Sequence, residues 1–169
     1  MAHAVTIEPQ AFSAEAWSPF GWVPVPDTDE RDAIHALAFA WDDAHLNFIH
    51  HGPDEVHRSS QGMVIDKLYR HDTHTQALMP LNGTSVVAVA PALVDFSNVG
   101  QLDTLRAFTL RPGNVFVLHR GTWHWGPFPL GDSPVRLLNL QGKRYRDDNA
   151  SIDLMERLGT RVTVRVPLD

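Results

Sequence analysis

The sequence predicts a mainly β protein, a barrel or sandwich of short strands with a few short helices. About eight short apolar or alternating runs follow one another, with turn signals roughly every 8–12 residues. The last run, residues 160–166, alternates most clearly, with Val162, Val164 and Val166 on one face. Neither a repeat nor a linker interrupts the 169 residues, so we expect a single domain over 1–169.

The first quarter of the chain carries the helical patterns. Residues 8–20 predict a short helix that ends at Ser18-Pro19, because proline disrupts the helix before it. Residues 20–25 then predict an edge strand, since they contain and precede prolines. Residues 32–44 fit either an amphipathic helix or a strand, and the pattern does not separate the two.

From residue 46 onward the pattern is typical of strands. The predicted strands cover residues 46–49, 63–71, 75–81, 84–90, 105–110, 115–118, 135–140 and 160–166. The run 84–90 is the least polar, so we expect it at the centre of a sheet. Asn82-Gly83 indicates a hairpin before it. Residues 151–158 predict a short helix closed by Gly159.

Composition and charge exclude several classes of function. The chain has no cysteine, which excludes disulfides, thiolate metal ligands and a thiol nucleophile. The net charge of −6 argues against binding nucleic acid through phosphates. No apolar run is long enough to span a membrane, and residues 1–5 do not resemble a signal peptide. We therefore expect a cytoplasmic protein, and the lack of a glycine-rich phosphate loop predicts no nucleotide cofactor.

Polar side chains gather at the ends of two predicted strands. Tyr69 and His71 point to the same face of a strand, Gln76 follows on the next strand, and His124 lies downstream. In a β-barrel these side chains could converge in the barrel mouth. Two imidazoles and an amide oxygen would bind a divalent metal ion and leave a position open for substrate. A metal-free pocket with a polar lining is the alternative.

Three further residues are candidates for binding an acidic substrate. Lys67 shares the strand face of Tyr69 and His71, although a solvated surface lysine has the same pattern. Arg106 could form a bidentate contact with a carboxylate. His119 borders the same predicted pocket mouth. Arg70 alternates with its neighbours and should face the other way, and Trp123 and Trp125 should be core or interface aromatics.

The spacing from Tyr69 to Gly83 resembles the first cupin motif, His-x-His, then Glu, then Gly. Tyr69 stands in place of the first His and Gln76 in place of the Glu. The end of the second cupin motif is similar to Gly121 through His124. This resemblance implies a cupin-like β-barrel, or double-stranded β-helix.

A more specific resemblance covers about residues 12–140. Arg70-His71, followed by residues 75–81, resembles the Arg-His, then Thr/Ser-Gln-x-Phe-Ile-Pro, of the ureidoglycolate lyase family. Residues 105–108, Trp123-His124 and Phe20-Gly21 are similar to other blocks of that family. Two positions depart from the family pattern: Tyr69 replaces a Glu, and Trp125 replaces the second His of Trp-His-His-Pro.

The resemblance implies a homodimeric lyase that splits ureidoglycolate, a small acid, into glyoxylate and urea during allantoin and purine breakdown. By matching positions, it places His71, Gln76 and His124 in the site, and we add Tyr69 as a catalytic residue beside the two imidazoles. Gln76, Lys67, Arg106 and His119 are then the expected substrate-binding residues. His71, Gln76 and His124 are the expected ligands of a divalent metal. A divergent cupin that binds or transforms another small carboxylate is the alternative.

Overall fold

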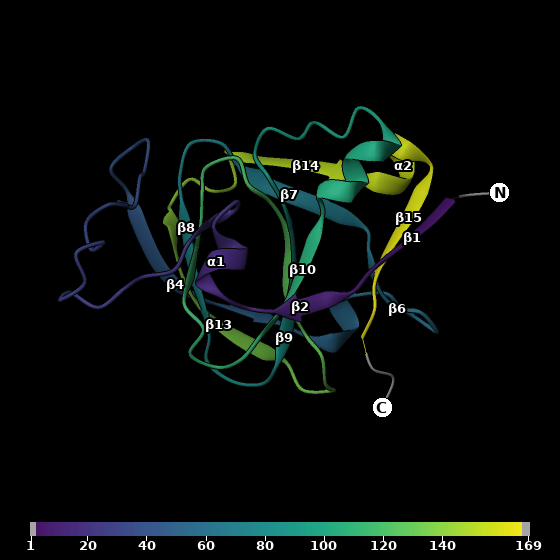
Figure 1. Cartoon of the computed structure of the whole chain (residues 1–169), viewed down its shortest axis with the longest axis horizontal. Helices are drawn as coiled ribbons and strands as arrows, with labels where there is room; N and C mark the ends of the chain where they lie inside the picture. Colours follow the sequence, from purple (N-terminus) through teal and green to yellow (C-terminus); the bar gives the residue numbers. More distant parts are fainter. Residues whose placement is uncertain (1–2, 167–169) are drawn as a thin grey trace.

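The computed structural model describes residues 3–166, so the two first and three last residues of the predicted domain lie outside the described range. Strands dominate the structure, as predicted, and they form three sheets (Figure 1). No ladder joins these sheets into one closed barrel over residues 3–166, and the sheets are arranged as a jellyroll, which confirms the predicted mainly β, cupin-like class of fold. No helix in this range is long and apolar enough to cross a membrane.

Two larger sheets build the body of the molecule. The six-stranded sheet runs, in spatial order, β14 (Asn149–Asp153), β7 (Lys67–His71), β12 (Trp123–Pro129), β9 (Ser85–Ala90), β10 (Arg106–Leu110) and β2 (Pro9–Ala11). The five-stranded sheet runs β3 (Gly21–Trp22), β11 (Phe116–Leu118), β8 (Gln76–Pro80), β13 (Val135–Gly142) and β4 (Ala44–His51). All six residues of β9 are buried, which confirms its predicted central place.

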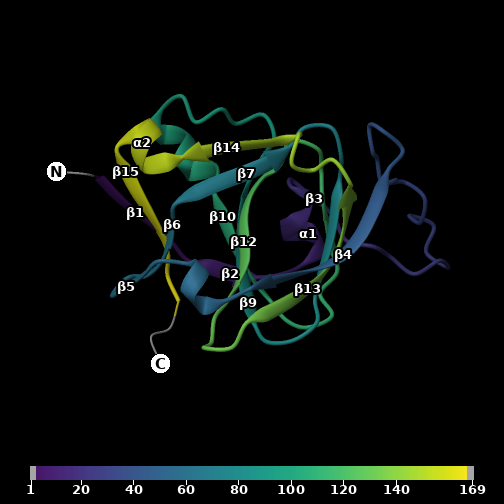
Figure 2. The same cartoon turned by 180° about the vertical axis from the view of Figure 1, so that it is seen from behind.

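A smaller sheet closes one end of the molecule. It runs β1 (His3–Ile7), β15 (Thr160–Val164), β6 (Gly62–Ile65) and β5 (Arg58–Ser59), and Figure 2 shows it beside α2 (Leu154–Leu158). Val162, Val164 and Val166 are all buried, as the alternation predicted. The other helical elements are α1 (Ala14–Trp17) and two short 3₁₀ helices, η1 (Pro53–Glu55) and η2 (Val99–Thr104).

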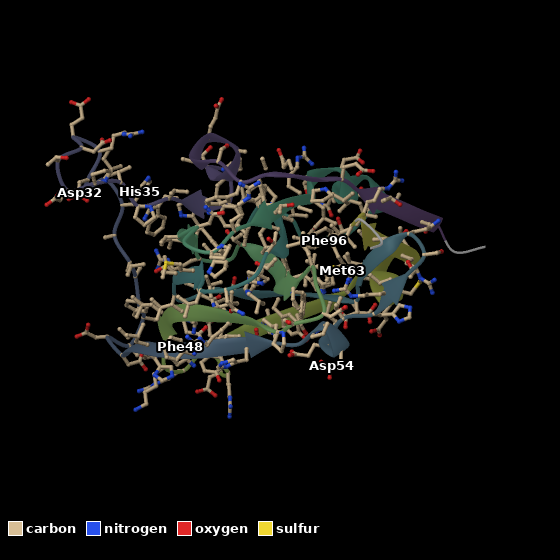
Figure 3. All side chains as sticks on the ribbon, turned by 90° about the horizontal axis from the view of Figure 1, so that it is seen from below. Asp32, His35, Phe48, Asp54, Met63 and Phe96 are labelled. Carbon is tan, nitrogen blue, oxygen red and sulfur yellow. The ribbon has the colours of Figure 1, made fainter. Side chains whose placement is uncertain are left out.

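Two apolar clusters form the core. One lies beneath the small sheet and includes Met63 and Phe96, which Figure 3 shows among the side chains between the ribbons. The other surrounds Trp17 of α1, whose ring lies 4.8 Å from Phe116 and 5.3 Å from Phe108 between centroids. The Trp17 indole N–H donates to the Val117 carbonyl at 2.9 Å, so this large side chain is buried without an unpaired donor.

Two predicted helices are shorter in the structure, because part of each segment pairs with a strand instead. Residues 8–20 do not form one helix, because Pro9–Ala11 pairs in parallel with β10 and only Ala14–Trp17 is helical. Residues 151–153 likewise pair with β7, so the predicted helix covers only Leu154–Leu158, ended by Gly159 at φ 63°.

Two predicted connections were also wrong. The predicted strand 63–71 is two strands, β6 and β7, which belong to different sheets. Asn82-Gly83 turns the chain with Gly83 at φ 62°, but β8 and β9 lie in different sheets, so the turn passes between sheets and makes no hairpin. A turn sequence specifies a change of direction, and the partner of each strand depends on the rest of the fold.

Residues 32–43 form neither the helix nor the strand that the pattern allowed, and β4 begins at Ala44. They are turns and bends with one isolated bridge, between Phe39 and His74. Ile34, Leu37 and Trp41 are 65%, 39% and 40% exposed, so their apolar spacing has no surface to pack against. Figure 3 shows Asp32 and His35 on this segment, which projects from the body of the molecule.

Candidate functional site

A pocket of about 420 Å³ opens between the two large sheets, and we call it the imidazole pocket. His71 on β7, Gln76 on β8 and His124 on β12 all line it, together with Tyr69. The remaining lining residues are Ile49, His51, Glu55, Asp66, Leu78, Trp125, Gly126, Pro127, Phe128, Leu137, Gln141, Tyr145 and Asn149. Three residues predicted to converge therefore do so in one pocket that solvent can enter.

The strand pairing explains this convergence. His124 lies directly opposite Tyr69 where β12 pairs with β7, which brings the two distant motifs together. The ring centroids of His71 and His124 are 5.5 Å apart. Gln76 begins β8 in the facing sheet, so the site is built from both large sheets.

A chain of amides fixes the orientation of Gln76. Its Nε2 donates to Asn139 Oδ1 at 2.8 Å, and Asn139 Nδ2 donates to Asn47 Oδ1 at 2.7 Å. The Gln76 Oε1 atom is buried and has no hydrogen-bond partner within residues 3–166. The protein therefore holds an amide oxygen ready for a ligand that it does not itself supply.

Burial keeps His71 and His124 neutral. Desolvation, followed by the neighbouring His124 and His74, lowers the pKa of His71 to about 3. Desolvation also lowers the pKa of His124 to about 4, against a hydrogen bond to Thr122 that raises it. The His124 Nδ1 lies 3.1 Å from the Thr122 carbonyl and must donate to it, so Nε2 carries the free lone pair.

A second group of possible ligands, which the sequence reasoning missed, lies behind His71. The ring of His74 stacks on His71 with 4.5 Å between centroids, and its Nδ1 lies 3.1 Å from Asp148 Oδ2. Each of three residues, His71, His74 and Asp148, offers one ligand atom. These atoms all lie within 4.8 Å of one another, which is close enough to hold one metal ion. The spacing of three residues between His71 and His74 was visible in the sequence. No feature of the sequence connected Asp148 to these two histidines.

The surroundings of Asp148 keep it ionised. It accepts hydrogen bonds from the backbone N–H groups of Asp72 and Thr73 at 3.1 and 2.9 Å, and from Thr73 Oγ1 at 2.6 Å. Burial by itself would raise the pKa of Asp148, but these hydrogen bonds, with the nearby His74, lower it overall. A fixed carboxylate beside two neutral imidazoles is a donor set that suits a divalent metal.

The other predicted binding residues lie elsewhere. Lys67 and Arg106 are exposed and do not line the imidazole pocket. The Arg106 guanidinium donates to the carbonyls of Asp103 and Leu105, which holds it on the surface of β10. His119 lines a different pocket, of about 390 Å³, beside Trp22 and His35. A narrow space nearby has both His119 and the site residues His71 and His124 in its lining.

The aromatic and cationic neighbours lie as predicted. Trp123 and Trp125 both belong to the apolar core, although Trp125 also forms part of the pocket wall. Arg70 faces away from the pocket, with its guanidinium carbon 4.5 Å from the Trp123 ring centroid and its Nε 3.1 Å from Asp72 Oδ1.

The charge of the imidazole pocket constrains what it can bind. Neither a lysine nor an arginine is among the described residues that line it, whereas Glu55 and Asp66 add two carboxylates at its surface. His51 lies 2.9 Å from Glu55 and is the basic group that faces it. An anionic ligand would therefore need another positive charge, such as a metal ion.

Comparison with known proteins gives one family match. The family described as ureidoglycolate lyase matches residues 4–158, which is most of the chain. No curated protein matches the sequence.

Several solved structures are similar to this chain at low identity. A dTDP sugar isomerase from Desulfovibrio desulfuricans G20 is 16% identical with a TM-score of 0.46, over 87% of this chain and 80% of that one. An oxalate oxidase is 14% identical with a TM-score of 0.45, over 86% and 73%. An oxalate decarboxylase from Lactobacillus farciminis is 15% identical with a TM-score of 0.44, over 89% and 34%. These similarities carry no inference about chemistry.

Proposed function

Because this chain belongs to the ureidoglycolate lyase family, it is a lyase that splits ureidoglycolate into glyoxylate and urea, and we propose that the imidazole pocket is where this happens. The observation that supports this location is the convergence of His71, Gln76 and His124 from three strands on one open pocket of about 420 Å³. That volume is ample for a small acid.

The reaction is an elimination at one carbon. Ureidoglycolate carries a hydroxyl, a carboxylate and a ureido nitrogen on the same carbon atom. The hydroxyl loses its proton, the C–O bond becomes a carbonyl, and the C–N bond breaks with its electrons passing to nitrogen. The nitrogen then gains a proton and leaves as urea, so the site needs a proton acceptor, a proton donor and a positive charge for the carboxylate.

The side chains of the imidazole pocket offer metal ligands and a proton donor. His71 and His124 are neutral, because their pKa values are lowered to about 3 and 4, so each presents a lone pair that suits a metal ion better than a proton. The His124 lone pair is on Nε2, since Nδ1 donates to Thr122. Tyr69, opposite His124, carries a hydroxyl that can protonate the departing nitrogen.

The residues present also fit a divalent metal ion. The Gln76 Oε1 and His71 Nδ1 atoms are buried without a partner in the described range, and the pocket lining lacks a lysine or arginine to hold a carboxylate. We propose His71, Gln76 and His124 as the ligands on the open side of the site. When bound there, the ion would neutralise the substrate carboxylate and polarise its hydroxyl oxygen.

The group of His71, His74 and Asp148 is the competing set of ligands. It shares His71 with the open set, but the His74 and Asp148 side chains are only 1% and 6% exposed. A structural ion is held in a closed site with its coordination filled by protein ligands, whereas a catalytic ion keeps a position open for substrate. The low exposure of His74 and Asp148 leaves little room for substrate at their set, so the open set suits catalysis better. The metal content of single variants separates the two sets.

The catalytic proposal is tested by release of urea and glyoxylate from ureidoglycolate by the purified, metal-replete protein. We expect His124→Gln to lower kcat/KM by roughly 100-fold or more, as is typical on removing an acid–base group or ligand. His50→Gln is the matched control, because His50 is exposed on β4 and does not line the pocket. A folded, metal-replete protein that releases no urea above background would remove the proposal.

The metal assignment is tested by elemental analysis. Each variant is first loaded with one divalent metal at a time, and unbound metal is then removed by exhaustive dialysis. Gln76→Met and His124→Gln should lose metal if the open set holds it, while Asp148→Asn should retain it. Loss of metal from Asp148→Asn alone would instead place the ion at the enclosed set. Both results are read without turnover, so a slow enzyme does not obscure them.

Three finer statements stay predictions from the sequence and its family resemblance. They are the homodimer, the cytoplasmic location and the place of the reaction in allantoin breakdown. The mass of the purified protein in solution, by light scattering, checks the first of these directly.

A further inference from the structure

One buried amide in the imidazole pocket has no role in the reaction described above. Gln141 lies near the end of β13, is 3% exposed, and lines the pocket. Its neighbour Gly142 packs against the imidazole cluster, because a Cβ added there would lie 3.0 Å from His74 Nδ1. Gln141 is therefore held on a strand whose end lies against His74, the ring that stacks on His71.

The carboxamide of Gln141 makes no hydrogen bond within residues 3–166, whereas that of Gln76 already makes one. Gln76 donates through Nε2 to Asn139, which leaves only its oxygen for a ligand. Within residues 3–166 the Gln141 side chain makes no hydrogen bond, yet neither of its amide atoms is sealed from solvent. Because Gln141 lines the pocket, its amide is available to a ligand bound there.

The ureido group is the part of the substrate that this carboxamide matches. A primary amide has one acceptor and two donors, and a terminal ureido group offers a carbonyl acceptor beside N–H donors. The two can form a pair of parallel hydrogen bonds. The Glu55 and Asp66 carboxylates in the same pocket can only accept and are exposed to water, so they match the ureido group less well.

We infer that Gln141 binds the ureido group of the substrate and so selects a ureido acid over other acids of the same size. This inference rests on the proposed function of the pocket. It assigns to Gln141 a role in binding and specificity and no proton transfer.

Binding of two unreactive analogues tests the inference without turnover. N-carbamoylglycine keeps the carboxylate and the ureido group of the substrate, and N-acetylglycine replaces the terminal NH₂ by a methyl group. By calorimetry, the protein as purified should bind N-carbamoylglycine about 3- to 10-fold more tightly, the effect of one hydrogen bond to a neutral partner. Gln141→Met should bind both analogues equally.

The control is Gln10→Met, which makes the same replacement at an exposed position on β2 and should keep the preference. Equal binding of the two analogues by the unaltered protein would overturn the inference, even if Gln141→Met did not fold. Binding of neither analogue, or an undiminished preference in folded Gln141→Met, would overturn it as well. Urea release by the unaltered protein reports separately on the proposed function, so the two failures are distinguishable.

Discussion

Two groups of histidines lie at two different pockets, and they differ in how the protein holds them. His71, His74 and His124 are 8%, 2% and 9% exposed and come from strands and a turn in the body of the molecule. His35 and His119 surround the second pocket, where His35 stacks on Trp22 at 5.0 Å between centroids. The pockets have similar volumes, about 420 and 390 Å³.

The contrast shows that a count of histidines does not locate a site. In the imidazole pocket, Thr122 orients His124, a chain of amides orients Gln76, and several polar atoms stay unpaired within residues 3–166. In the second pocket, His35 lies on the projecting segment and is exposed. Fixed orientation together with unsatisfied buried atoms is the physical mark of a site that waits for a ligand.

The sharpest test of this contrast removes one imidazole from each group. His71→Asn should lower kcat/KM for urea release by roughly 100-fold or more, since His71 belongs to both sets of metal ligands. His119→Asn should change it by less than about 3-fold, because His119 faces the second pocket. Equal losses in the two variants would mean that the pockets act as one site.

Low pH should destabilise the folded protein more through the histidines of the imidazole pocket than through those of the second pocket. In the folded, metal-free protein the pKa values of His71 and His124 are about 3 and 4, while unfolded histidine titrates near 6.5. Below about pH 6.5 the unfolded chain therefore binds more protons, and stability falls as pH falls, by up to ~1.4 kcal/mol per pH unit for each imidazole. The loss continues until the folded pKa is reached.

Urea unfolding between pH 7 and pH 4.5, in the presence of a chelator, measures this slope. His71→Asn should flatten it clearly, since one buried imidazole no longer titrates. His119→Asn should flatten it less, because the His119 pKa is also lowered by burial but the side chain is only half-buried. A slope that none of these variants changes would show that other groups control acid stability.

The chain of amides should contribute a smaller, measurable amount to stability. Asn139→Leu would leave the Gln76 amide N–H without an acceptor and remove the donor to Asn47. Leaving buried polar groups unpaired should lower the free energy of unfolding by about 1–3 kcal/mol. Denaturant unfolding measures the change, and Asn98→Leu is the comparison variant, because Asn98 is exposed and its side chain makes no capping hydrogen bond to η2. A loss equal to that of Asn98→Leu would argue that the three amides do not stabilise the fold.

The smallest effect is expected on the projecting segment. His35→Ala removes the stack on Trp22 but leaves the sheets intact, so the melting temperature and the rate of urea release should change little. A fall in activity comparable to that of the His71 variant would show that the second pocket takes part in the reaction.

The sequence predicted the class of fold and the convergence of three pocket residues, whose roles stay predictions. The convergence of His71, Gln76 and His124 followed from their positions at strand ends, and the structure places all three in one pocket. Asp148 was not found, because it reaches His74 from a turn more than 70 residues downstream. Gln141 was also missed, since its sequence neighbours give no sign that its amide would stay unpaired.

The sequence by itself determined the class of fold, the faces of the strands and the family to which the chain belongs. Alternation along a strand decides which side chains share a face, and that information is local. Only the tertiary structure decided that β8 and β9 join different sheets, that Lys67 and Arg106 lie outside the pocket, and that His74 meets Asp148. The reason is that strand partners are chosen by hydrogen bonds and packing between segments far apart in the chain, which no short pattern encodes.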